Sequence, residues 1–158
     1  MTRTRRKPTW EQHFPTRLRF EREALAAYPH LSKGGVGSRR YSRTTYGLVV
    51  PIPEYESREI ELQFFRATSQ PEVARIYADG PTSSPHRYAP HSKDARRRSS
   101  LCIWYPEDPP ALRWIPKDGL LSLIEMTRIH LFKEAYWRET GEWLGDEAPH
   151  PTSDSKPC

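Results

Sequence analysis

The spacing of hydrophobic and polar residues along the chain predicts two helices. The first begins near residue 15 and ends before Pro29, with its apolar side chains on one stripe. That stripe consists of Phe14, Leu18, Leu25 and Tyr28. The second runs over residues 117–140 and is stopped by Gly141. Its broad apolar face predicts a largely buried helix, and that face consists of Leu120, Leu121, Leu123, Ile124, Leu131, Phe132 and Ala135.

Three segments between these helices have the pattern of strands. Residues 59–65 show the cleanest alternation, which predicts that Ile60, Leu62 and Phe64 face inward. Residues 44–52 and 73–77 are the other two. Because parallel neighbours need a dozen or more linking residues and these links are short, we expect an antiparallel meander. The sequence therefore predicts an α+β domain: an N-terminal helix, a β-meander, a long irregular loop and a C-terminal helix.

The glycine run at residues 33–38, KGGVGS, invites comparison with phosphate-binding loops. It follows a predicted helix and precedes a predicted strand, which reverses the order that such loops need. It also lacks the terminal Gly-Lys-Ser/Thr. We therefore expect a linker here.

The length of 158 residues suits one domain, which we place at residues 10–148. Residues 1–9 are basic and without apolar periodicity, so we expect a flexible arm, and residues 149–158 are expected to be a flexible tail. No apolar run approaches the length of a membrane span, and the N-terminus lacks the apolar core of a signal peptide. These features predict a cytoplasmic protein.

The net charge of +5 is concentrated at residues 3–7, 39–43 and 93–98. Such clusters indicate an acidic protein partner, a nucleic acid or simply a solvated basic face. Proteins that stack bases interleave aromatic side chains with their cations, and the run at 93–98, KDARRR, has none. Nucleic acid is therefore the less favoured partner.

Cys102 lies in a short apolar run that the proline-rich segment after it ends, SSLCIWYPEDPPALRW at residues 99–114. The only other cysteine, Cys158, ends a polar tail, so we expect no structural disulfide and a free thiol at Cys102. Because no helix begins at the thiol, the dipole that lowers the pKa of a proteolytic cysteine is missing. These features favour an acyl acceptor over a peptidase nucleophile.

The order of motifs resembles the ubiquitin-conjugating enzyme family. SPHRY (residues 84–88) stands where that family has a His-Pro-Asn turn, LCIW (101–104) holds the cysteine, and RWIP (113–116) precedes the last helix. LCIWYP and the ending GEWLGDEAPH further resemble the small bacterial ubiquitin-conjugating-like proteins of CBASS antiphage operons. The resemblance covers roughly residues 14–150 and implies the ubiquitin-conjugating fold.

The resemblance implies that Cys102 carries the C-terminus of a partner protein as a thioester and transfers it to an amine. The implied partner is the C-terminal tail of a cGAS-like nucleotidyltransferase or a ubiquitin-like protein, in antiphage defence. No cofactor and no metal are expected, since the chain lacks a Cys-x-x-Cys pair. Two alternatives are a non-catalytic binding module on the same fold and a cysteine hydrolase that removes a modifier.

Further site residues follow from this resemblance and from the residues themselves. His86 would build the architecture of the site, and Tyr88 and His91 are candidate oxyanion donors. His150 would deprotonate an incoming lysine, whereas His130, among polar neighbours, is expected at the surface. The binding candidates, by charge or by position beside the thiol, are Arg96, Arg97, Arg98 and Trp104.

Overall fold

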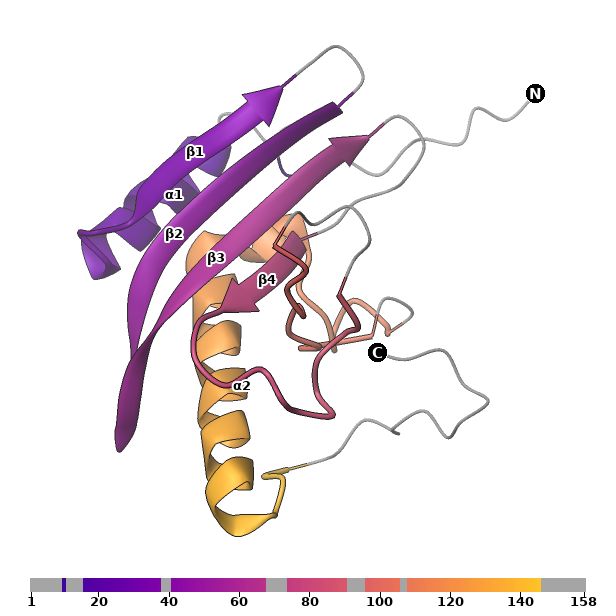
Figure 1. Cartoon of the computed structure of the whole chain (residues 1–158). Coiled ribbons are helices and arrows are strands. Elements are labelled where there is room, and N and C mark those ends of the chain that lie inside the picture. The colour runs from indigo at the N-terminus through magenta and orange to yellow at the C-terminus, as the bar shows by residue number, and fades with distance from the viewer. Residues whose placement is uncertain are drawn as a thin grey trace.

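The computed structural model describes Trp10 and residues 16–37, 41–67, 74–90, 96–105 and 108–145. The arm expected at residues 1–9 and the tail expected at 149–158 lie outside these ranges. The elements are α1 (Thr16–Ala27), β1 (Ser32–Gly37), β2 (Tyr41–Ile52), β3 (Tyr55–Ala67), β4 (Ala74–Ala78), the short 3-10 helix η2 (Pro116–Asp118) and α2 (Leu120–Thr140). The predicted α+β class is therefore confirmed (Figure 1).

The four strands form one antiparallel sheet in the order β1-β2-β3-β4, as expected for a meander. The longest pairing joins β2 to β3, with a register shift only between Val50 and Ile52, next to the turn. Glu54, in that turn, has a φ of 65°. Alternation then fixes which side chains of β3 reach the core, and Ile60, Leu62 and Phe64 are buried as predicted.

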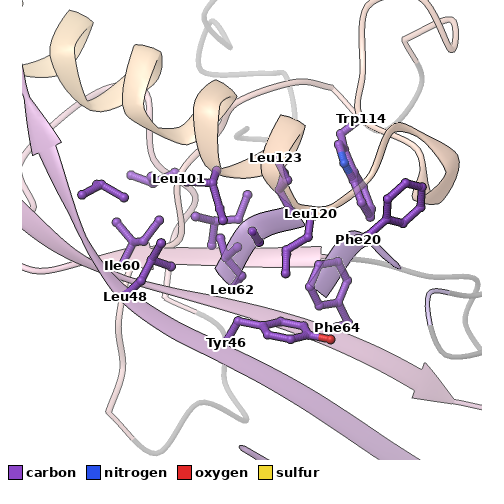
Figure 2. Close-up of a cluster of buried hydrophobic side chains, with 14 of the residues drawn as sticks. Phe20, Tyr46, Leu48, Ile60, Leu62, Phe64, Leu101, Trp114, Leu120 and Leu123 are labelled. Carbon is purple, nitrogen blue, oxygen red and sulfur yellow. The ribbon is translucent and has the colours of Figure 1, made fainter. Parts of the chain in front are cut away.

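Both helices contribute side chains to one core on a single face of the sheet (Figures 1 and 2). α2 buries four residues of the face expected of it, whereas the other three are half-buried. The buried ones are Leu120, Leu123, Ile124 and Leu131, and the half-buried ones are Leu121, Phe132 and Ala135. It ends at Gly141, whose φ of 81° is the left-handed conformation that the sequence predicted for a helix stop. Within the described residues, no helix has both the length and the apolar character needed to cross a bilayer.

The end of the core next to α1 is aromatic. Trp10 stacks on Phe64 and Phe20, with ring centroids 4.9 and 6.0 Å apart, and lies 5.8 Å from Trp114. The indole of Trp114 donates a hydrogen bond to the carbonyl of Gly119, which fixes the loop that leads into α2. Large aromatic side chains therefore provide much of the buried area that the low apolar content of the chain would otherwise lack.

The predicted stripe of α1 is wrong in its details. Leu25 is 44% exposed, whereas Phe20, Glu21 and Ala24 are buried. The helix carries few apolar residues, so tertiary contacts decide its orientation. Glu21 turns inward because the hydroxyl of Tyr46 donates a hydrogen bond to its carboxylate.

The glycine run is also corrected: it is not a linker but the strand β1. Each of its six residues has a Cα partner in β2. A Cβ at Gly35 would lie 2.7 Å from the carbonyl oxygen of Arg43, so this pairing needs glycine at that position. Pairing with β2 thus overrides the weak strand propensity of glycine.

Candidate functional site

The Cys102 segment lies along β4 and pairs with the SPHRY segment. Leu101 donates its N–H to the carbonyl of Ile76 (2.8 Å) and forms an antiparallel bridge with Arg87. On either side of that bridge, Cys102 donates to the carbonyl of His86 and Tyr88 donates to the carbonyl of Ser100, both at 2.9 Å. Leu101 is 4% exposed and anchors the segment in the core, while Cys102 is half-buried.

This pairing brings three of the predicted site residues together. In the register of this bridge, Cys102 is opposite His86 and diagonal to Tyr88. What joins Cys102 to His86 is a backbone hydrogen bond, and the side chains of both His86 and Arg87 reach α2. The bridge therefore brings the backbones of the two segments together.

His86 is held by aromatic neighbours from the C-terminal part of the chain. Its ring stacks on Trp143 with centroids 3.5 Å apart, and the rings of His130 and Trp137 meet it edge-on at 6.4 Å. Its backbone N–H donates to the hydroxyl of Ser84. The stacking on Trp143 fixes the imidazole of His86 beside the cysteine segment.

Beneath the bridge lies a buried ion pair that sequence reasoning missed. The guanidinium of Arg87 donates two hydrogen bonds to the carboxylate of Glu134, at 2.9 and 2.8 Å, and both side chains are almost fully buried. Arg138 donates a third at 3.1 Å, and Nε2 of His130 lies 3.8 Å from the same carboxylate. This cluster ties the SPHRY segment to α2.

Burial alone would raise the pKa of Glu134, but the hydrogen bonds and charge of Arg87, with His130 nearby, outweigh it and hold that pKa well below its usual range. The expectation that His130 lies on the surface is wrong, since it is 5% exposed. His130 and Glu134 fall on the apolar stripe of α2, one and two turns after Thr127. Their position on that stripe, rather than the polarity of their neighbours, was the available signal.

Tyr88 supports the loop that follows the cysteine. Its hydroxyl donates to the carbonyl of Trp104 at 3.2 Å, so its proton is engaged with the backbone. Burial, followed by the nearby Tyr105 and Asp108, raises the pKa of Tyr88. Trp104, the binding candidate in this loop, is half-buried and packs against the core. Tyr88 thus orients the chain around the thiol.

The three arginines proposed to grip a partner differ in their surroundings. Arg98 stacks over the ring of Tyr77 at 3.9 Å and pairs with Glu61 at 3.2 Å, and Arg96 lies 3.9 Å from the same carboxylate. Although burial works in the opposite direction, the hydrogen bonds from Arg98 and Gln63 lower the pKa of Glu61. Arg97 is exposed, with a φ of 52°. Arg98 therefore fastens its segment over β3 and β4, and Arg97 faces solvent.

The expectation of a free thiol at Cys102 is wrong in this structure, where Cys102 belongs to a disulfide and no described cysteine is free. Cys158, the other cysteine of the sequence, lies outside the described residues. The expectation rested on the polar composition of the tail. Composition does not determine whether two cysteines of a chain can form a disulfide. The entropy lost on closing a loop grows only slowly with its length, so a long polar segment is no barrier to a bridge.

His91 and His150, the remaining catalytic candidates, lie outside the described residues. Across the described ranges, no group of three potential metal ligands comes together. Described residues thus provide a cysteine segment paired with the segment that carries His86 and Tyr88, next to a buried ion pair. Such a set can accept and release an acyl group if the sulfur is reduced.

Comparison with known proteins gives no match for this chain among protein-family models, curated proteins or solved structures.

Proposed function

We propose that the chain has a ubiquitin-conjugating-like fold and carries an acyl group on Cys102. The observation that supports this most directly is the short antiparallel bridge that pairs the backbone of Cys102 with that of His86. The element order also agrees, because a helix and a meander precede the cysteine and a Trp-containing loop and a long helix follow it. The proposed cargo is the C-terminus of a cGAS-like nucleotidyltransferase or of a ubiquitin-like protein, in the cytoplasm and in antiphage defence.

The chemistry proceeds in two exchanges. In the first, the sulfur of Cys102 attacks the carbonyl carbon of an acyl group that arrives as a thioester or acyl adenylate. The new C–S bond forms, the thiol or AMP leaves, and the proton of Cys102 passes to His86 or to solvent. In the second, an amine attacks the same carbon, the C–S bond breaks, and the sulfur recovers a proton as the amide forms.

This chemistry requires the disulfide of Cys102 to be reduced first. Thiol reductants of the cytoplasm reduce most disulfides there, so the proposed compartment supplies the necessary step. A carrier in a thioester form cannot be disulfide-bonded at the same sulfur. The reduced state is therefore the active state in this proposal.

The test is the intact mass of the full-length protein isolated under acidic conditions from cells that hold its native operon. Phosphine treatment reduces disulfides and leaves thioesters, whereas hydroxylamine cleaves thioesters and leaves disulfides. We expect a protein-sized adduct that survives phosphine and is lost with hydroxylamine. Cys102→Ser should replace it with an ester that resists phosphine and yields to base.

Cys158→Ser is the matched control, because it removes a cysteine and leaves Cys102 in place. It should keep the hydroxylamine-sensitive adduct. An adduct that phosphine removes would be a disulfide and would contradict thioester carriage. Absence of any adduct, with Cys102→Ser fully active in the cell, would favour a binding module.

His86→Gln tests the role of the imidazole. We expect slower acyl transfer, by about tenfold or more, with a changed dependence of the transfer rate on pH. An unchanged pH profile with a normal thioester yield would restrict His86 to a structural role beneath Trp143.

A further inference from the structure

Strand β1 forms one edge of the sheet (Figure 1). All six of its residues are exposed, and no described residue pairs with it on the side away from β2. An unpaired edge presents backbone N–H and C=O groups to solvent, which is a template for an added strand. The opposite edge, at β4, is occupied by the Cys102 segment through Leu101.

The alternation of hydrogen bonds across the sheet identifies the outward groups of β1. Asp79 donates to the carbonyl of Glu59, so odd-numbered residues of β3 direct their backbone groups to β4 and even-numbered ones to β2. Even-numbered residues of β2 lie opposite even-numbered residues of β3 and bond to them. The odd-numbered residues of β2 therefore bond to β1, where they lie opposite even-numbered residues. The outward N–H and C=O groups therefore belong to Lys33, Gly35 and Gly37.

Among the described residues beside this edge, basic side chains outnumber acidic ones. An open hollow along β1 is lined by Arg17, Lys33, Arg43 and the glycine run. Glu21 is the carboxylate that pairs with Lys33, at 2.8 Å, and it lies 3.6 Å from Nε of Arg17. Among the described residues, Glu21 therefore pairs with two of the three cations that line the hollow. The buried Nε of Arg43 makes no hydrogen bond to any described group.

We propose that β1 binds an extended acidic segment of another protein as a fifth strand. The backbone of that segment would pair with Lys33, Gly35 and Gly37, and its carboxylates would meet the cations of the hollow. The glycines leave no side chains in the way, and a Cβ at Gly34 would meet nothing within 4 Å. The site is separate from the thiol, since β1 and the Cys102 segment occupy opposite edges of the sheet.

Charge decides between this occupant and two others. A second copy of the chain would bring Lys33, Arg17 and Arg43 of two molecules together across the edge, which like charges oppose. A nucleic acid would satisfy the charges but has no ladder of amide and carbonyl groups to pair with the strand. An acidic peptide satisfies both features.

A fluorescent peptide in which Glu and Val alternate is the probe, added to the full-length protein. We expect saturable binding by anisotropy, together with slower hydrogen exchange at the amides of Gly35 and Gly37. A Lys and Val peptide should not bind. Methylation of the alternate peptide amides that face β1 should weaken binding about tenfold or more, and this result requires no change to the protein.

Two variants locate the site on the protein. Gly37→Pro removes an outward N–H at a position where a Cβ meets only the side chain of Ser42 at 3.8 Å, and Lys33→Gln removes a charge. Each should weaken binding about three- to tenfold. Lys117→Gln makes the same charge change at an exposed position of η2 and should leave binding within about twofold of wild type.

Equal affinity for the methylated peptide, or exchange protection confined to residues outside β1, would overturn the proposal. Self-association that protects the amides of β1 and excludes the peptide would assign the edge to a second copy. Displacement of the peptide by an oligonucleotide, with no protection of β1 amides, would assign it to nucleic acid. Cys102→Ser should bind the peptide normally, so failure of thioester carriage and failure of this proposal are distinguishable.

Discussion

The two edges of the sheet differ: another segment bonds to one edge, and the described residues leave the other exposed. At β4, Leu101 donates its N–H to Ile76, and the chain beyond it carries Cys102. At β1 the described residues leave the edge exposed, with Lys33 as the one charged residue of the strand. Proteins usually cover an edge or place charges on it. The described residues thus cover the edge that holds the thiol and leave the outer edge of β1 unpaired.

The two edges also differ in what stabilises them. The β4 side is anchored by the core side chain of Leu101 and by the buried pair of Arg87 and Glu134. β1 has small, exposed side chains that bury little surface. Substitutions should therefore be costly on the first side and mild on the second.

The largest effect is expected at Glu134. Glu134→Ala leaves Arg87 buried beside Arg138 without its carboxylate, and should lower the free energy of unfolding by about 3–5 kcal/mol. Denaturant titration followed by circular dichroism measures the loss. Glu125→Ala, in the partly exposed pair with Arg128, should change stability by less than about 1 kcal/mol. Equal losses for the two variants would contradict a buried anchor.

Leu101 should come next. Leu101→Ala removes a side chain that is 4% exposed and should reduce the free energy of unfolding by about 2–4 kcal/mol, through lost burial and the cavity left behind. Leu112→Ala is the matched control, because Leu112 is 66% exposed and should lose less than about 0.5 kcal/mol. If Leu101→Ala were as mild as its control, the β4 edge would be covered without being anchored.

Acid should weaken the same anchor. The pKa of Glu134 is lower in the folded state than in the unfolded state, where it is near 4.5. Its contribution is therefore complete above pH 4.5 and is lost as the pH falls below it, by about 1 kcal/mol per pH unit. Unfolding titrations between pH 6 and 3 measure this slope. The double variant Arg87→Met, Glu134→Leu should flatten it, and an unchanged slope would place the acid-sensitive group elsewhere.

The sequence allowed prediction of the parts whose signal is local. Alternation at Ile60, Leu62 and Phe64 describes a strand with one buried face, and a broad apolar face with Gly141 behind it describes α2. In these two segments, tertiary contacts agree with the structure that the local sequence favours.

The parts that could not be predicted depend on distant partners. Arg87 and Glu134 are 47 positions apart, so neither one signals the other in the sequence. His130 was misplaced because polar neighbours suggested a surface, although its helical position lies on the buried stripe. β1 was missed because glycine carries no hydrophobic pattern, and its strand conformation comes from pairing with β2.

The smallest effect in this comparison separates two neighbouring glycines of β1. Gly35→Ala would place a Cβ 2.7 Å from the carbonyl oxygen of Arg43, so the strands must move apart, and we expect a loss of about 1 kcal/mol. Gly34→Ala meets nothing within 4 Å and should be neutral or stabilising by a few tenths of a kcal/mol, since it reduces the freedom of the unfolded chain. Thermal unfolding of the two variants measures the difference. Equal unfolding midpoints would mean that β1 moves away from β2 at little cost in free energy. An added strand could then also displace β1.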